Sequence, residues 1–187
     1  MTKLTAKELA EIVQAINSAS APEGMATKVI AIDGLGGAGK STLAARFAKE
    51  LDSPIVQTDD FASPDNPLDW WPRLRKQVLE PLSRNKSAHY QRYDWDTQRM
   101  AEWHDIEPQA FLIIEGVSAS REAFRPYLAF SIWIETPRGE RLRRGLQRDG
   151  KEAYEQWQQW QRDEDEWVKQ EQPHEKADLV ISGGTSY

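Results

Sequence analysis

Short apolar runs alternate along the chain with longer segments whose apolar residues lie three or four positions apart. The short runs predict buried strands over 28–33, 53–58, 111–115, 130–135 and 178–182. The segments with helical spacing predict helices over 40–51, 70–82, 120–128, 137–149 and 152–172. Strands that alternate with helices predict an α/β fold, with a parallel sheet of about five strands that is flanked by helices on both faces.

The first 24 residues precede the first strand and contain a helix of their own. One apolar stripe along this helix is formed by Leu9, Ile12, Val13 and Ile16. Thr5 and Glu8 have the spacing of a capping box, so the helix is expected to begin near Thr5, and residues 18–24 are a linker. We expect residues 1–24 to pack on the outside of a main domain that spans 25–187, and we assign this helix no chemistry.

The first predicted strand leads directly into Gly34-Leu-Gly-Gly-Ala-Gly39-Lys40-Ser41-Thr42, which matches the pattern G-x-x-x-x-G-K-[ST]. Glycines at this spacing let successive backbone N–H groups surround a polyphosphate, and the helix that opens at Lys40 adds the positive end of its dipole. Lys40 is expected to reach the terminal phosphates, and the Ser41 hydroxyl to hold Mg2+. The apolar run before the loop and the helical spacing after it favour this interpretation over a plain glycine-rich turn. The residues expected to bind ATP are Gly34, Gly36, Gly37, Ala38, Gly39, Lys40, Ser41 and Thr42.

Composition limits the other functions that the chain can have. A length of 187 residues suits one domain with a substantial core, and the net charge of -6 argues against a general nucleic-acid binder. The chain has no cysteine, no apolar stretch long enough to span a bilayer and no opening signal peptide. We therefore expect a cytoplasmic protein with a small-molecule substrate and no nucleic-acid or membrane partner. Self-association stays open, and the eight tryptophans are expected to fill cores more often than to stack on a ligand.

Acidic residues follow two of the predicted strands. Asp59 and Asp60 come directly after the second strand, and Glu115 ends the third. Ligands of open parallel sheets bind beyond the carboxyl ends of the strands, so we expect these acids to meet Lys40 at one edge of the sheet. A phosphoryl transfer to an alcohol needs a base beside the hydroxyl and magnesium on the phosphates. Asp59 or Asp60 can be that base and Glu115 can hold the metal, whereas the plain alternative is that these acids cap helices or lie in solvent.

The predicted helix 137–149 is strongly basic. Its arginines are Arg138, Arg141, Arg143, Arg144 and Arg148. Thr136 is expected to cap this helix, Pro137 to begin it and Gly150 to end it, while Ser120 is expected to cap the short helix before it. Guanidinium groups match phosphate oxygens, so about two of these arginines can close over the phosphates as a lid. A basic helix that is merely solvated is the plain alternative.

Taken in order, these motifs resemble the uridine kinase-like P-loop kinases, which are relatives of pantothenate kinase and phosphoribulokinase. The resemblance covers about residues 26–184. It is carried by Asp33 with the phosphate loop, Thr58-Asp-Asp-Phe61, Tyr93-Asp-Trp95, Glu115-Gly116, Arg141-Leu-Arg-Arg144 and Ala177-Asp-Leu-Val-Ile181. It implies a P-loop NTPase fold with an Arg-rich lid, and ATP and Mg2+ as cofactors.

The resemblance also implies roles for single residues. Asp59 is the expected general base, Tyr93 and Trp95 the expected contacts to a nucleobase, and Asp69 the expected partner of the ribose hydroxyls. From the chemistry of the transfer itself, and apart from the resemblance, the residues expected to stabilise the transferred group are Lys40, Arg144 and Arg148. Arg141 is expected at the substrate, and the residues expected at the metal are Ser41, Asp60 and Glu115.

We expect a Mg-ATP-dependent kinase that phosphorylates a hydroxyl of a small metabolite, foremost the 5′-hydroxyl of a uridine- or cytidine-like nucleoside. An acceptor that is a pantothenate-like or sugar-like alcohol stays open, because Ala62 and Gln98 stand where the family has an aromatic residue and a pyrimidine-reading histidine. A non-catalytic NTP-binding regulatory module also stays open. The presence of Lys40, Asp59 and Glu115 together argues against that third alternative.

Overall fold

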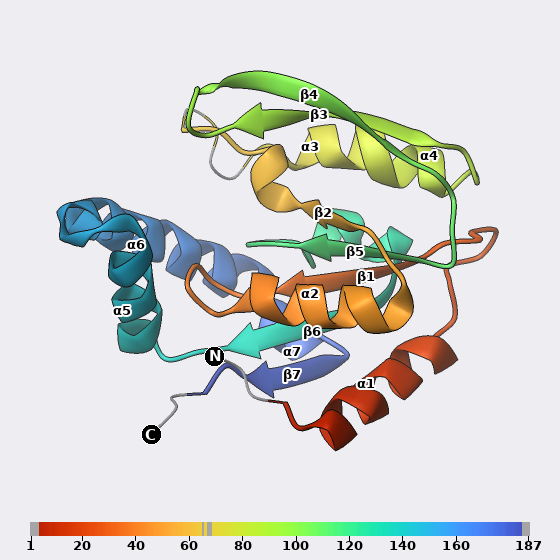
Figure 1. Ribbon diagram of the computed structural model, residues 1–187, viewed down its shortest axis with the longest axis horizontal. Coiled ribbons are helices and arrows are strands. Elements are labelled where there is room, and N and C mark those ends of the chain that lie inside the picture. Colours follow the sequence, from red (N-terminus) through yellow and green to blue (C-terminus); the bar gives the residue numbers. More distant parts are fainter. Residues whose placement is uncertain (1–3, 65, 67–68, 185–187) are drawn as a thin grey trace.

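The computed structural model describes residues 4–64, 66 and 69–184, and it has a five-stranded parallel sheet at its centre (Figure 1). The strands follow the order β2-β5-β1-β6-β7, and every neighbouring pair is parallel. Their bounds are β1 (Lys28–Asp33), β2 (Ile55–Gln57), β5 (Phe111–Glu115), β6 (Leu128–Glu135) and β7 (Leu179–Ser182). The predicted fold class is therefore confirmed. Of the loop expected over 62–69, residues 65, 67 and 68 lie outside the described residues.

Helices cover both faces of this sheet. The α-helices are α1 (Ala6–Ser18), α2 (Lys40–Leu51), α3 (Trp71–Leu74), α4 (Glu80–Leu82), α5 (Arg138–Asp149), α6 (Tyr154–Glu171) and α7 (Pro173–Lys176). A π-helix, Arg75–Leu79, joins α3 to α4, so the helix predicted over 70–82 is continuous. Pro81 explains the wide turn, because its ring cannot fit against the carbonyl four residues earlier in α geometry. Within the described part of the chain, no helix combines the length and the apolar character needed to cross a bilayer.

The core lies on both faces of the sheet because successive strand residues point to opposite sides. Ile30 and Ile32 of β1 belong to the cluster that packs under α2, together with the fully buried Phe47. Val29 and Ala31 belong to the opposite cluster, which packs against the helical segment from α3 to α4. The inner strands β1 and β5 are therefore buried on both faces, which is why they appear in the sequence as unbroken apolar runs.

The N-terminal helix α1 begins as the sequence predicts. The Thr5 hydroxyl accepts a hydrogen bond from the Glu8 backbone N–H at 3.2 Å, and the Glu8 carboxylate accepts one from the Thr5 N–H at 2.7 Å. Ile16 of this helix is fully buried in the cluster under α2. The division of the chain at residue 24 stays a prediction.

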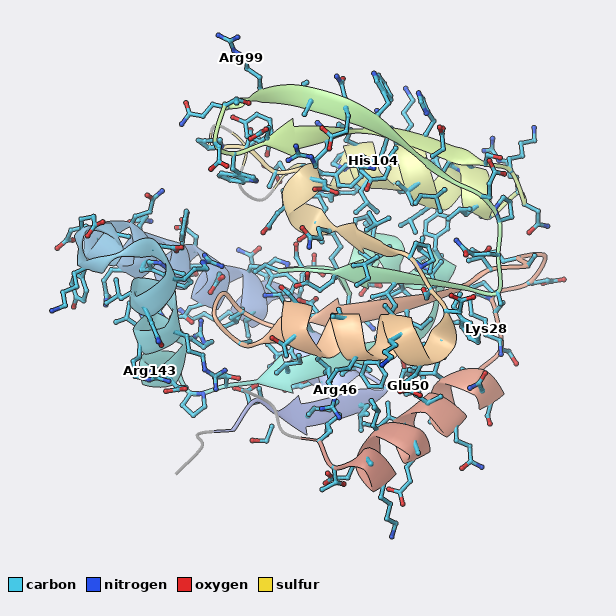
Figure 2. All side chains as sticks on the ribbon, in the orientation of Figure 1. Lys28, Arg46, Glu50, Arg99, His104 and Arg143 are labelled. Atoms are coloured by element: carbon cyan, nitrogen blue, oxygen red, sulfur yellow. The ribbon has the colours of Figure 1, made fainter. Side chains whose placement is uncertain are left out.

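An antiparallel hairpin that the sequence did not predict covers the helical segment from α3 to α4. It consists of β3 (Ala88–Asp94) and β4 (Arg99–Ile106), and it forms the top layer in Figure 1. Ala88 and Tyr90 reach the core, whereas β4 is mostly exposed, and Figure 2 shows Arg99 directed away from the molecule. Because β4 has no buried apolar face, its sequence lacks the alternation by which such strands are predicted.

Two predicted helix caps are wrong, and both side chains contact the phosphate loop or the strand before it. The Thr136 hydroxyl donates a hydrogen bond to the Ala38 carbonyl at 3.1 Å, and α5 begins after Pro137 without a side-chain cap. The Ser120 hydroxyl donates to the Asp33 carboxylate at 2.7 Å, and the following 3-10 helix begins after Arg121. These partners are distant in sequence, so local spacing does not reveal them. Gly150 ends α5 as predicted, with a φ of 91°.

Asp33 ends β1, and its fully buried side chain links the phosphate loop to the turn after β5. Its carboxylate accepts hydrogen bonds from the backbone N–H of Gly34, Ser118 and Ser120, at 2.7, 2.9 and 2.8 Å, and from the Ser120 hydroxyl. Burial raises the pKa of Asp33, while the hydrogen bonds from Ser120 and Gly34 and the charge of Lys40 act against that increase. The carboxylate therefore fixes two loops at the same edge of the sheet.

We predict that Asp33→Asn destabilises the protein. In either orientation, the amide NH2 group of asparagine faces two of the four buried donors, which costs about 2 kcal/mol and lowers the Tm by about 4–8 °C. Thermal unfolding followed by circular dichroism measures the change. Asp105→Asn makes the same substitution at an exposed position of β4 and should leave the Tm within about 2 °C; an equal loss in both variants would contradict the role given to Asp33.

Candidate functional site

A cavity of 660 Å³ lies at the carboxyl ends of β1, β2 and β5. One wall is the phosphate loop, which contributes Gly36, Gly37, Gly39, Lys40, Ser41 and Thr42. The opposite walls come from the ends of β2 and β5 and from helices α5 and α6, which lie beyond the same end of the sheet in Figure 1. This is the position at which open parallel sheets bind their ligands.

The glycines of the loop allow its tight path. Gly37 and Gly39 have φ values of 77° and 97°, which disfavour other residues, and a Cβ atom at Gly37 would overlap the Arg141 carbonyl. Two of the predicted loop residues do not line the cavity. Gly34 sits against β6, and Ala38 is fully buried, where its carbonyl accepts the hydrogen bond from Thr136. These two residues hold the loop in place.

Lys40, Ser41 and Glu115 lie together at the base of the cavity. The Lys40 ammonium donates a hydrogen bond to the Leu35 carbonyl at 3.2 Å, and the Ser41 hydroxyl donates to the Glu115 carboxylate at 3.2 Å. Glu115 is 5% exposed, and burial raises its pKa, while the charge of Lys40 lowers it. Mg2+ is commonly held by one or two protein oxygens together with phosphate and water oxygens. Ser41 and Glu115 fit that donor set; no group of three or more acidic or histidine side chains suited to a metal occurs among the described residues.

The two neighbouring acids after β2 differ in their surroundings. Asp59 is exposed and lines the cavity, and its carbonyl accepts a hydrogen bond from the Trp95 indole N–H at 3.0 Å. The Asp60 carboxylate instead accepts a hydrogen bond from the Tyr90 hydroxyl at 3.1 Å, on the side of the hairpin. Burial raises the pKa of Asp60. The structure therefore brings Asp59, and not Asp60, to the side where Ser41 and Glu115 lie.

The residues expected to hold a nucleoside are divided between two hollows. Trp95 lines the large cavity and is 39% exposed. Tyr93 and Asp69 line a second hollow of 350 Å³ together with Phe61 and Arg73. The rings of Tyr93 and Trp95 meet edge to face with their centroids 5.6 Å apart, so the two hollows are adjacent. The sequence placed all three residues in a single substrate site.

Of the five arginines of α5, Arg144 and Arg148 line the cavity. All five N–H donors of the Arg144 guanidinium have acceptors: the Glu140 carboxylate at 2.7 Å and the carbonyls of Gly37, Ala38, Gly183 and Gly184 at 2.9–3.4 Å. Arg144 therefore joins the phosphate loop to the segment after β7. Arg148 pairs with Asp149 and lies over the Trp157 ring, whereas Arg143 is on the outside of α5 (Figure 2).

Arg141 lies beneath the loop and not among the residues that line the cavity. It is 4% exposed, and its guanidinium donates hydrogen bonds to the Thr136 carbonyl at 3.2 Å and the Glu164 carboxylate at 3.1 Å. Its backbone carbonyl packs against Gly37. Any contact between Arg141 and a substrate therefore requires that Glu164 move first.

Helix α6 supplies a wall of the cavity that the sequence did not predict. Its contributions are Trp157, Trp160, Asp163 and Glu164. Glu164 accepts a hydrogen bond from the Gly36 backbone N–H at 2.8 Å, and burial raises its pKa. The positions 157, 160 and 164 are three and four apart and so share one face of the helix. This spacing is visible in the sequence and predicts the shared face, but it does not indicate that this face meets the phosphate loop.

Comparison with known proteins finds relatives by structure only. No protein-family model and no curated protein matches the chain. A possible uridine kinase from Bacillus stearothermophilus is 19% identical, with a TM-score of 0.68 over 92% of this chain and 96% of that one. A candidate fructose transport system kinase from Silicibacter sp. TM1040 is also 19% identical, with a TM-score of 0.70 over 95% and 99%. D-glycerate 3-kinase from Cryptococcus neoformans is 15% identical, with a TM-score of 0.55 over 81% of each chain.

The chain has the fold of the P-loop kinases. The expected P-loop NTPase fold is thus confirmed, and the neighbours span nearly the full length of this chain. At this level of identity the likeness concerns the fold alone.

We predict that Arg144→Ala lowers the Tm by about 4–8 °C, because it removes charge-assisted hydrogen bonds worth about 2 kcal/mol in total from the loop. Arg144→Lys should recover less than half of the loss, since an ammonium group has three donors and not five. Arg143→Ala is the matched control: this neighbouring arginine also pairs with Glu140 but is exposed, so its loss should leave the Tm within about 2 °C. Equal Tm values for the two alanine variants would contradict the assignment.

Proposed function

We propose that the protein is a Mg-ATP-dependent kinase that transfers the γ-phosphoryl group to a hydroxyl of a small molecule. The observation that carries the proposal is that Asp59 lines the same cavity as the phosphate loop, Lys40 and Glu115. A phosphate cradle, a metal-binding pair and a carboxylate base are the parts that phosphoryl transfer to an alcohol requires.

In the proposed reaction, Asp59 orients the acceptor hydroxyl and takes its proton. The acceptor oxygen forms a bond to the γ-phosphorus while the bond from that phosphorus to the β–γ bridging oxygen breaks, and ADP leaves. Lys40 and Arg148 stabilise the negative charge on the transferred group, and Arg144 keeps the loop in its binding conformation. Mg2+ held through Ser41 and Glu115 would neutralise charge on the phosphates. Positioning and electrostatics supply most of the acceleration.

The acceptor that we propose first is a uridine- or cytidine-like nucleoside, phosphorylated at its 5′-hydroxyl. The resemblance of the motifs supports it, and so does Trp95, a partly exposed aromatic surface held next to Asp59 by a hydrogen bond. A non-nucleoside alcohol is the second candidate. It is favoured because Tyr93 and Asp69 line a hollow separate from that of Trp95, so the expected nucleoside contacts do not face one space.

An acceptor panel decides between these candidates. The protein is incubated with Mg-ATP and, separately, with uridine, cytidine, pantothenate, glycerate and simple sugars, and ADP release is followed. Stimulation by uridine or cytidine alone supports the first candidate, and stimulation by another alcohol supports the second. ATP binding without turnover on any acceptor would contradict the proposed activity and favour a regulatory NTP-binding module.

We predict that Asp59→Asn lowers kcat by about a hundredfold or more, the lower range for the loss of a general base, and leaves the Kd for ATP within about twofold. Acceptor-dependent ADP release and calorimetry provide the two measurements. Asp60→Asn is the control, because this neighbouring carboxylate is turned toward Tyr90. If Asp60→Asn were the inactive variant and Asp59→Asn near normal, the base would be Asp60.

A further inference from the structure

The Glu164 carboxylate of α6 lies directly against the phosphate loop. One oxygen accepts the Gly36 N–H at 2.8 Å, and the other accepts the Arg141 guanidinium at 3.1 Å. A Cβ atom at Gly36 would approach the first oxygen to 2.9 Å, so a larger residue here would require the carboxylate to shift. Glu164 is 7% exposed, and Lys40 is close enough for its charge to stabilise the carboxylate. A buried anion is thus surrounded by a backbone N–H group and two cationic side chains.

These partners are of the kind that binds a phosphate group. Backbone N–H groups of a phosphate loop hold phosphate oxygens, a lysine reaches the terminal phosphates, and guanidinium groups match phosphate oxygens. A carboxylate has the charge and the acceptor oxygens to take such a place. Two anions cannot share one N–H group and one guanidinium, because their repulsion in a buried site is strong.

We propose that Glu164 is a built-in competitor of the nucleotide, which occupies a phosphate subsite formed by the Gly36 N–H and the Arg141 guanidinium until a phosphate group displaces it. This inference rests on the proposed function and concerns the regulation of the same site. When the carboxylate leaves, the Arg141 donor that held it becomes available to the incoming phosphate, while the other contact of Arg141, to the Thr136 carbonyl, can persist.

Helix α6 sets how readily Glu164 leaves. Trp157, two turns earlier on the same face of α6, packs against Gly145 of α5 and donates a hydrogen bond to Asp149 at 2.9 Å. Asp165, which follows Glu164, forms an ion pair with Arg138 of α5. Exchange of Glu164 for a phosphate group is therefore linked to the packing of α6 on α5. Displacement of Glu164 loosens the wall of the cavity that α6 forms.

The test compares Mg-ATP binding by the full-length wild-type protein and by Glu164→Gln, using calorimetry. The neutral amide competes weakly for the Gly36 N–H and does not hold the Arg141 charge, so we expect the variant to bind ATP about tenfold more tightly. Glu166→Gln is the matched control, since Glu166 lies two residues away, is exposed and pairs only with Lys169 among the described residues. Its Kd should stay within about twofold of wild type.

A second probe and a second variant keep the test decisive if Glu164→Gln folds less well. Inorganic tripolyphosphate with Mg2+ should show the same order of affinities as ATP, because the competition is for a phosphate subsite. Glu164→Ala should give a larger ligand-induced increase in Tm than wild type, even if its own Tm is lower.

Each outcome has a distinct meaning. If wild type binds ATP and Glu164→Gln binds it equally or more weakly, the competitor role is overturned and the proposed kinase site stands. If neither protein binds ATP or tripolyphosphate, both proposals fail. If only the Glu164 variants bind, the loop is a nucleotide site that Glu164 closes, and the inference holds.

Discussion

The buried carboxylate of Asp33 is the constraint on which the site depends. It ends the central strand, and its four hydrogen bonds fix the start of the phosphate loop and the turn that follows β5. A buried charge is tolerated only when its hydrogen-bonding capacity is used, so the two loops cannot separate without a large cost. Together with the pairing of β1 and β5, which sets Glu115 beside Ile32, this side chain fixes the relative position of the loop amides and of Glu115.

Close packing then brings the β2 end to the same place. Gly116 directly follows Glu115, and a Cβ atom there would overlap the Thr58 side chain, so the ends of β5 and β2 touch. Asp59 comes next after Thr58 and is carried to the edge of the cavity, where the Trp95 indole binds its carbonyl. Glu115 thus lies at the end of β5, Lys40 and Ser41 lie in the first turn of α2, and Asp59 lies in the 3-10 helix that directly follows β2. Groups carried by helices and strands are placed more precisely than groups on loops.

Features that depend on local order were predictable from the sequence, and features that depend on distant partners were not. The apolar runs gave the five strands, the glycine spacing gave the phosphate loop, and the rule for strand ends brought Asp59 and Glu115 together. Thr136 was expected to cap a helix, but its hydroxyl donates a hydrogen bond to Ala38 in the phosphate loop, almost a hundred residues away in the sequence. The hairpin was not predicted because β4 lies in an exposed layer and has no regular apolar alternation. The wall formed by α6 was not predicted because helical spacing shows which residues share a face but not what that face packs against.

The groups that bind an anion must also be stabilised when no ligand is bound, and Glu164 does this for the phosphate loop. A loop whose N–H groups point inward, beside Lys40 and the buried Arg141, concentrates positive charge in a region partly removed from water, and an isolated buried charge is costly. A carboxylate from α6 satisfies these groups and stabilises the folded protein without nucleotide. The same contact must then oppose the nucleotide, since stabilisation of the unliganded state lowers affinity by the same free energy.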